Sequence, residues 1–233
     1  MENESFLGHL EALRGVLLRS LTALAIAFPL GYWLGSQLIP LLTKFCLPEG
    51  QAALHYFTPM EAFIAELKLG AIIAFILIFP YVAWQFWKFV SPALYQNEKQ
   101  KIIKAALFSS LLFLAGAAFA GFLLLPLLMR FAFSFQGPAL RPLFGLAGFL
   151  GLAGGLLLAG GLIFQLPIVV FTLVALGIIK YETLKKGRPY AVIILLVLAA
   201  VATPPDVVSQ LLLFVPAYAL FELGLFLSAR AKS

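Results

Sequence analysis

Charge is scarce in this sequence, and its scarcity excludes most classes of soluble protein. Asp, Glu, Lys and Arg make up 11% of the 233 residues, against about 25% in ordinary soluble domains. Hydrophobic residues make up 63%, and the mean hydropathy of +1.04 is too high for a water-exposed surface. Disorder is excluded too, because disordered chains are weakly hydrophobic and highly charged. The composition therefore predicts a single integral membrane domain over residues 1–233.

The usual signatures of catalysis and of metal binding are also missing. The sequence has no Gly-x-x-x-x-Gly-Lys-Ser/Thr phosphate loop and no Gly-x-Ser-x-Gly elbow. His9 and His55 stand apart from any Cys or carboxylate cluster suited to zinc. The single cysteine, Cys46, cannot form an internal disulfide and is interpreted as a packed thiol. We therefore expect no enzyme, no metal site and no cofactor, and any work must draw on a membrane gradient or a partner.

Six apolar stretches predict transmembrane helices, since a span needs about 20 apolar residues. Their approximate bounds are 17–38, 67–89, 103–128, 148–178, 189–202 and 207–227. The alternation typical of barrel strands is absent, so we predict an all-α, polytopic bundle. The last two stretches are short: a helix over 189–203 would be about 22 Å long, against a hydrocarbon core of roughly 30 Å. Asp206, in the turn between them, can cap the last helix, and the mismatch predicts locally thinned lipid.

Lys and Arg determine the predicted orientation. With the N-terminus in the cytoplasm, 12 of these residues fall on the cytoplasmic side and 4 on the other, which follows the positive-inside rule. The four external ones are Lys44, Lys68, Arg130 and Arg141. Six spans return the C-terminus to the cytoplasm. The acidic first residues and the long first apolar stretch are unlike a cleavable signal peptide. The net charge of +6 is interpreted as topology and anionic-lipid contact, with no nucleic-acid partner.

Small residues recur at a spacing of four in two of the spans. The pairs are Gly116 with Ala120, Ala117 with Gly121, and Gly151 with Gly155. Such pairs let helices approach closely in lipid, and they fit either internal packing or a subunit interface. No internal repeat is visible, so the inverted-repeat signature of many transporters is missing.

The first polar constellation is an amphipathic start. Phe6, Leu10 and Leu13 share one helical face, and Glu11 and Arg14 lie on the polar side. This stretch is either an interfacial helix leading into the first span or a helix that presents a carboxylate at the cytoplasmic surface.

The second constellation is the first cytoplasmic loop, residues 84–99. Its aromatic residues suit an interfacial belt, and Glu98 stands among lysines. The loop is either a solvated, charge-balanced segment or, with Glu11, a carboxylate pair for a ligand that carries guanidinium groups.

Two further sets of polar residues stand out. One is the external segment 57–63, with Pro59, Glu61 and Phe63. The other is the intramembrane pair Gln165 and Glu222. A carboxylate inside a span is a functional hypothesis by default, so Glu222 has either a function or a snorkelling role. The neutral Gln165 suits an interhelical hydrogen bond.

Together these stretches resemble the TatC family, the multispanning receptors of the twin-arginine protein translocase. The family start His-Leu-x-Glu-Leu-Arg is similar to residues 9–14, His-Leu-Glu-Ala-Leu-Arg. The family loop Phe-x-x-Pro-Ala/Gly-Leu-Tyr-x-x-Glu is fully matched by residues 89–98. The external Thr-Pro-x-Glu-x-Phe motif is matched by residues 58–63, and Thr-Pro-Pro-Asp by residues 203–206. The resemblance covers nearly the whole chain in order, and only the loop motif is specific by itself.

Two positions depart from the family pattern. The first-helix Glu of the family falls on Ala12, with Glu11 one place earlier, about 100° around a helix. The Glu of the family motif Phe-Glu-x-Pro is replaced by Gln165, which can hydrogen-bond but cannot carry charge.

The resemblance implies a concave, glove-shaped bundle in a prokaryotic inner membrane that receives the signal peptides of folded export substrates. By this resemblance Glu98, helped by the first helix, holds the two arginines, and the apolar segment of the signal peptide enters the bundle. The implied signal-peptide residues are Glu98, Glu11, Arg14, Phe89, Pro92, Leu94 and Tyr95. The resemblance further implies that single-span partners of the TatA and TatB type dock on the last two spans, that the receptor complex is oligomeric, and that the proton-motive force drives transport.

Two other classes of function compete with this reading. The first is an ion-coupled secondary transporter with Glu61, Gln165 and Glu222 around a midplane cavity. The second is a membrane-embedded enzyme, for which no catalytic constellation is visible.

Overall fold

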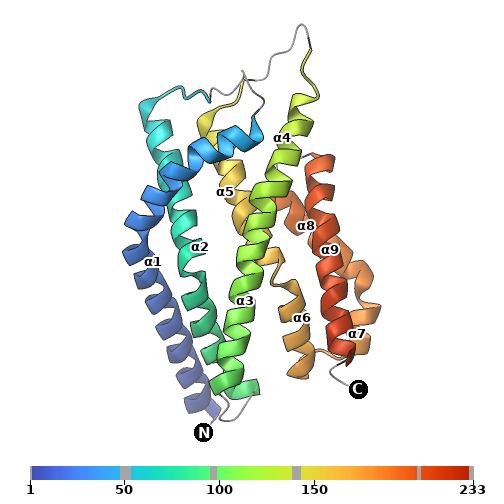
Figure 1. Ribbon diagram of the computed structural model, residues 1–233. Coiled ribbons are helices and arrows are strands. Elements are labelled where there is room, and N and C mark those ends of the chain that lie inside the picture. Colours follow the sequence, from blue (N-terminus) through green and yellow to red (C-terminus); the bar gives the residue numbers. More distant parts are fainter. Residues whose placement is uncertain (1, 48–53, 95–98, 138–142, 204–205, 231–233) are drawn as a thin grey trace.

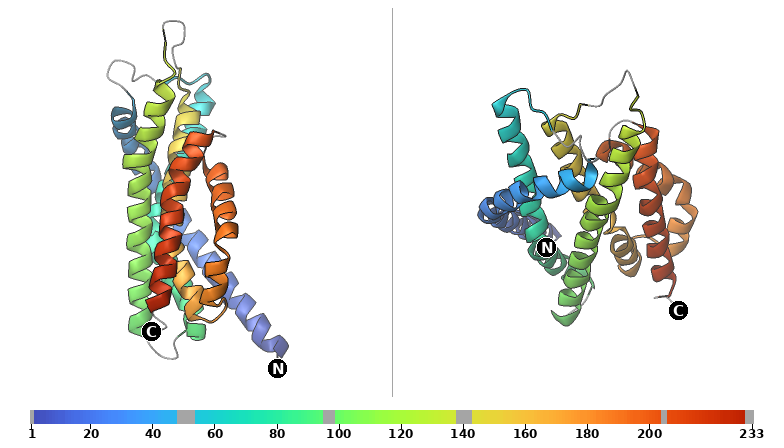
Figure 2. Two further views of the ribbon diagram at one scale, coloured as in Figure 1. Left: turned by 90° about the vertical axis from the view of Figure 1, so that its right-hand side faces the viewer. Right: turned by 45° about the horizontal axis from the view of Figure 1, so that its top comes forward.

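The computed structural model describes residues 2–47, 54–94, 99–137, 143–203 and 206–230, with the backbone alone at 2–7, 9, 91–94 and 99–102. These residues are almost wholly helical (Figure 1). The helices run in the following order: α1 (Glu2–Cys46), α2 (Pro59–Leu94), α3 (Lys99–Phe119), the π-helical η1 (Ala120–Leu124), α4 (Leu125–Phe133), α5 (Leu146–Ile163), α6 (Leu166–Ala175), α7 (Tyr181–Lys186), α8 (Arg188–Ala202) and α9 (Val207–Arg230). The start of α1 and the end of α9 lie at the same end of the bundle (Figures 1 and 2), as an even number of spans requires.

The predicted six-span bundle is confirmed. Within the described residues, five helical stretches are long and apolar enough to cross a membrane, and a shorter apolar helix is the sixth. The five are Leu10–Cys46, Pro59–Val90, Ile103–Phe133, Leu146–Ala175 and Val207–Arg230, and the shorter one is Arg188–Ala202. Each predicted span overlaps one of these helices, with ends that differ by at most eight residues.

The prediction that the sixth span is short is wrong. Helix α9 has 24 residues and is about 36 Å long, because it continues through Ser228 to Arg230. The Ser228 hydroxyl donates to the carbonyl of Gly224 at 2.7 Å, and the Arg230 guanidinium lies 4.4 Å from the centre of the Phe226 ring. Of the two helices of this last pair, only α8, with 15 residues, is shorter than the hydrocarbon core.

Helices α1 and α2 cross closely because small residues meet between them. A Cβ on Gly31 would lie 2.6 Å from the backbone carbonyl of Gly70 and from the Ala74 side chain. One helical turn away, a Cβ on Gly35 would lie 3.3 Å from the Gly70 Cα. The pairs Gly31/Gly35 and Gly70/Ala74 therefore form a small-residue crossing of the kind that packs helices in lipid. This crossing was not among the small-residue pairs predicted from the sequence.

The predicted small-residue pairs differ in whether they take part in packing within the chain. A Cβ on Gly160 of α5 would meet the Gly116 carbonyl at 2.5 Å and the Ala120 Cβ at 2.6 Å, so Gly116 and Ala120 serve internal packing. Gly121 faces the side chain of Leu157 at 3.0 Å. Gly151 has open space at its Cβ position and is exposed, so it takes no part in packing within the chain.

The predicted fourth span is broken rather than continuous. Phe164 and Gln165 separate α5 from α6, and Pro167 lies in the first turn of α6. Proline lacks an N–H, and its ring clashes with the carbonyl four residues earlier, so Pro167 favours a break after Ile163. Gly177, with a φ of 71°, follows the end of α6, where the left-handed conformation favours glycine.

The last two spans form a hairpin that stops short of its neighbours. The tip between α8 and α9 lies below the outer ends of α2 and α4 (Figure 1; left panel of Figure 2). Asp206 caps α9 as predicted, accepting a hydrogen bond of 2.7 Å from the N–H of Ser209.

Candidate functional site

An apolar groove lies among α2, α3, α5 and α6, toward the end of the bundle where α2 ends and α3 begins. It is a cavity of about 600 Å³. Its walls are rich in aromatic residues, namely Phe75, Phe79, Phe86, Trp87 and Phe89. Phe79 stacks on Phe113 of α3, with ring centroids 3.6 Å apart, which fixes one wall of this groove.

Three polar side chains, Ser109, Gln165 and Thr172, line the groove. The Gln165 amide donates to the backbone carbonyl of Ser109 at 2.9 Å, and the Ser109 hydroxyl donates to the amide oxygen of Gln165. Gln165 therefore joins the break between α5 and α6 to α3, as an interhelical hydrogen bond. Thr172 bonds only the Ile168 carbonyl of its own helix, at 2.6 Å.

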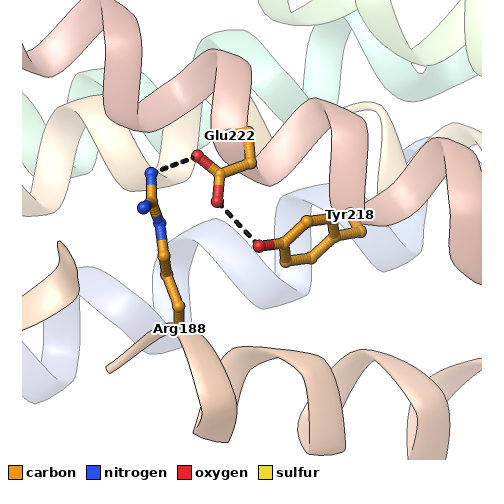
Figure 3. Close-up of polar contacts among 3 residues, drawn as sticks. All are labelled: Arg188, Tyr218 and Glu222. Carbon is orange, nitrogen blue, oxygen red and sulfur yellow. Dashed lines mark hydrogen bonds and ion pairs between the residues drawn. The ribbon is translucent and has the colours of Figure 1, made fainter. Parts of the chain in front are cut away.

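Glu222 lies elsewhere, between α8 and α9 (Figure 3). The Arg188 guanidinium binds its Oε2 at 2.6 Å, and the Tyr218 hydroxyl donates to its Oε1 at 2.8 Å. Arg188 is the first residue of α8, so this cluster fixes where α8 starts along α9. Neither Arg188 nor Tyr218 was predicted from the sequence as a partner of Glu222.

The external segment forms the start of α2. The Thr58 hydroxyl accepts from the Glu61 N–H at 3.1 Å, and the Glu61 carboxylate accepts from the Phe57 N–H at 3.1 Å. This reciprocal arrangement is close to a capping box, with Pro59 at the first helical position, where proline is tolerated. Phe63 is exposed. Glu61 thus has a structural role at the helix end.

The neighbouring loop is held by a short backbone pairing. The His55 N–H donates to the Phe144 carbonyl at 3.0 Å, and the Leu146 N–H donates to the His55 carbonyl at 2.7 Å. The pairing ties the segment before α2 to the start of α5.

The family "Sec-independent protein translocase protein (TatC)" matches residues 8–216. The chain belongs to the TatC family. The TatC of Carboxydothermus hydrogenoformans is 35% identical, over 96% of this chain and 92% of its own length. The TatC of Escherichia coli is 32% identical, over 97% of this chain and 89% of its own length.

Solved structures agree with this assignment. A crystal structure of the twin-arginine translocase receptor TatC matches with a TM-score of 0.88 at 32% identity, over 97% of this chain and all of that one. A second, of the same receptor in DDM, has a TM-score of 0.86 at 31% identity, over 94% of this chain and 99% of that one. As a TatC-family member, the chain is a multi-pass inner-membrane component of the Sec-independent protein translocase, and the family is not an enzyme family.

Within the TatC frame, the predicted signal-peptide residues fall into three groups. Phe89 lines the groove. Glu11 and Arg14 are exposed in the first turns of α1. This amphipathic start is continuous with the first span and is not a separate interfacial helix. Tyr95 and Glu98 lie outside the described residues, and Pro92 and Leu94 lie in the last turn of α2, where the backbone alone is described.

The structure separates the residues on which the transporter alternative depended. Gln165 lines the groove, but neither Glu61 nor Glu222 does. Among the described residues, no group of three His, Cys, Asp or Glu side chains is placed to hold a metal ion.

Proposed function

We propose that this TatC-family chain is the receptor for twin-arginine signal peptides and that the apolar groove takes the apolar segment of the peptide. The observation that carries the proposal is the groove itself: a cavity of about 600 Å³ with aromatic walls and three polar side chains, two of them bonded to each other. Sites that bind apolar ligands have mostly apolar walls and few polar groups. The groove fits a hydrophobic helix or strand better than an ion.

The arginine pair would bind beside the mouth of this groove. Val90 lines the groove, α2 continues for four residues to Leu94, and Glu98 follows four residues later. Four helical and four extended residues reach at most about 20 Å, so Glu98 stays within that distance of Val90. A carboxylate binds guanidinium bidentately, and Glu11 at the same membrane face is the second candidate acceptor.

The short α8 is the proposed docking face for TatA/TatB-type single-span subunits. Its outward residues Ile193, Val197 and Val201 are more than half exposed, and its inward residues Leu195 and Ala199 are buried. Short partner spans would match the lipid beside a short helix. In this proposal the assembled, oligomeric receptor complex uses the proton-motive force for transport.

Blocking the groove tests where the apolar segment binds. Val169 lines the groove on α6 and is 46% exposed, so Val169→Trp adds bulk without disturbing the core. We expect weaker photo-crosslinking from a probe in the apolar segment of a twin-arginine peptide. Val215→Trp, on the exposed face of α9, is the matched control and keeps crosslinking. Equal crosslinking in the two variants would place the segment elsewhere.

Removing the carboxylate charge tests the arginine site. Glu98→Gln should weaken binding of a twin-arginine peptide by about 1.5–3 kcal/mol, at least about tenfold in Kd. Glu182→Gln, an exposed carboxylate of α7, is the control for charge loss at the same membrane face. Unchanged affinity in Glu98→Gln would refute the assignment.

A separate set of variants tests whether Glu11 replaces the family carboxylate that is missing at Ala12. If Glu11 takes the place of the family carboxylate, Glu11→Ala weakens peptide binding and adding Ala12→Glu restores part of it. If Glu11 takes no part, Glu11→Ala has no effect and Ala12→Glu alone strengthens binding. The affinities of the two single variants and the double variant separate these cases.

A further inference from the structure

A second cavity, here called the outer cavity, lies under the end of α1 and shares no lining residue with the groove. It measures about 220 Å³, and all of its lining residues are apolar. They come from the last turns of α1, from α2, α3, η1 and α5, and include Leu41, Phe45, Ile73, Leu114, Ala118 and Phe122. A cavity with only apolar walls does not hold ordered water, so a ligand that fits it has to be apolar.

The mouth of the outer cavity faces the membrane. Phe45 of α1 and Phe122 of η1 meet edge to face with ring centroids 6.1 Å apart, and they are 56% and 63% exposed. Ala118 is exposed as well. These residues belong to membrane-spanning stretches, so what reaches them is lipid. The π-helical turn η1 supplies part of the wall, and π-helical turns are frequent at functional sites.

Two cations follow lining residues of the outer cavity along the chain, toward the external side. Lys44 is the neighbour of Phe45 and is exposed on the last turn of α1. Arg130 is exposed on α4, eight residues or about 12 Å beyond Phe122 along the helical column. Among the described residues neither forms an ion pair. They are two of only four cations assigned to the external side, which the positive-inside rule disfavours.

We propose that the outer cavity holds one acyl chain of an anionic phospholipid of the outer leaflet, with its phosphate bound by Lys44 and Arg130. The apolar pocket lies deeper in the membrane and the cations lie toward the surface, in the order of acyl chain and headgroup in a lipid. The lipid would fasten the end of α1 to η1 and α4. Leu42 and Cys46 of α1 already pack in one core cluster with Leu125 and Leu128.

Lipid binding to the delipidated full-length chain tests the proposal. Native mass spectrometry in neutral detergent compares phosphatidylglycerol with phosphatidylcholine of the same acyl chains. The wild-type chain should prefer phosphatidylglycerol. Lys44→Gln and Arg130→Gln should each reduce that preference about fivefold, because a basic residue near anionic lipid contributes about that factor. Lys68→Gln, at another exposed external cation, is the control and leaves the preference unchanged.

Filling the cavity tests the acyl-chain half of the proposal. Ala118→Phe should weaken binding of both lipids, whereas Ala115→Phe, on an exposed position of α3 outside the cavity, should not. Competition by glycerol phosphate alone would show a headgroup site without an acyl chain and would overturn the proposal. So would a change in oligomeric state of Ala118→Phe with unchanged lipid binding, because the occupant would then be a second copy. Signal-peptide affinity should stay normal in all these variants, so failure here is separate from failure of the receptor role.

Discussion

Two glycines of α5 give the sharpest test of the packing, because the same substitution should act in opposite directions. Gly151 and Gly160 both lie within this helix. A Cβ on Gly151 meets nothing within 4 Å, whereas a Cβ on Gly160 would lie 2.5 Å from the Gly116 carbonyl and 2.6 Å from the Ala120 Cβ. Real Cβ atoms do not approach backbone so closely, so α3 and α5 would have to move apart.

The magnitudes follow from two effects. Replacing Gly by Ala inside a helix is favourable by about 0.5–1 kcal/mol, and both variants receive this gain. Overpacking a tight contact costs about 1–3 kcal/mol, and only Gly160→Ala incurs this cost. Gly151→Ala should therefore be stabilised and Gly160→Ala destabilised, with a difference of about 1–3 kcal/mol between them.

Thermal unfolding of the purified variants in one detergent measures the difference. A chain of this size shifts by about 2–4 °C for each kcal/mol, so the two melting temperatures should lie on opposite sides of the wild-type value. Gly116→Ala is a second probe of the same contact, since its Cβ would meet the Gly160 carbonyl and the Phe164 ring, and it should be destabilised too. If Gly160→Ala melts with or above Gly151→Ala, α3 and α5 do not meet as described.

Three further predictions concern polar contacts and the hairpin. Gln165→Leu should lower stability by about 1–2 kcal/mol, because two interhelical hydrogen bonds are lost, whereas Thr172→Val, which breaks only a bond within its own helix, should lower it less. Glu222→Gln should lower the melting temperature and loosen α8, measured by amide exchange, because Arg188 loses its carboxylate partner; unchanged exchange would show that the pair does not hold α8. Lengthening both helices of the α8–α9 hairpin by about one turn should reduce transport but leave signal-peptide binding intact, and normal transport would exclude thinning from the mechanism.

The sequence predicted where the chain crosses the membrane better than how the helices break. Hydropathy located every span. It did not reveal the break at Phe164 and Gln165, because a single neutral polar residue does not lower the hydropathy of the fourth stretch enough to divide it. Proline alone is ambiguous, since Pro29 and Pro40 lie inside the unbroken α1 while Pro167 begins α6 after a break. Whether a proline breaks a helix in lipid depends on neighbouring helices that re-satisfy the freed carbonyls, and a single sequence does not show them.

Neither the groove nor the outer cavity could be predicted from the sequence, for a related reason. In a soluble helix, polarity separates the outer face from the core, but in a membrane span both faces are apolar. Phe79 is buried and Phe86 is exposed on the same helix, and nothing in their chemistry distinguishes them. Polar pairs distant in sequence were also hidden: Arg188 and Glu222 are 34 residues apart. Asp206 was predictable because capping is local.

The offset of the hairpin results from two features acting together. The Arg188–Glu222 ion pair fixes the start of α8 eight residues before Arg230, so α8 begins about 12 Å inside the end of α9. From that start α8 rises only 15 residues to Ala202. Helix α9 is long enough to cross the bilayer. Helix α8 starts about 12 Å inside the cytoplasmic end of α9 and ends after 15 residues, so the hairpin does not extend as far outward as its neighbours. The tip, with Asp206 as a polar cap, therefore lies below the outer ends of α2 and α4 (Figure 1). We therefore expect the lipid beside the hairpin to be thinner on the external side, and we expect the Arg188–Glu222 ion pair, which aligns the two helices, to influence the extent of thinning.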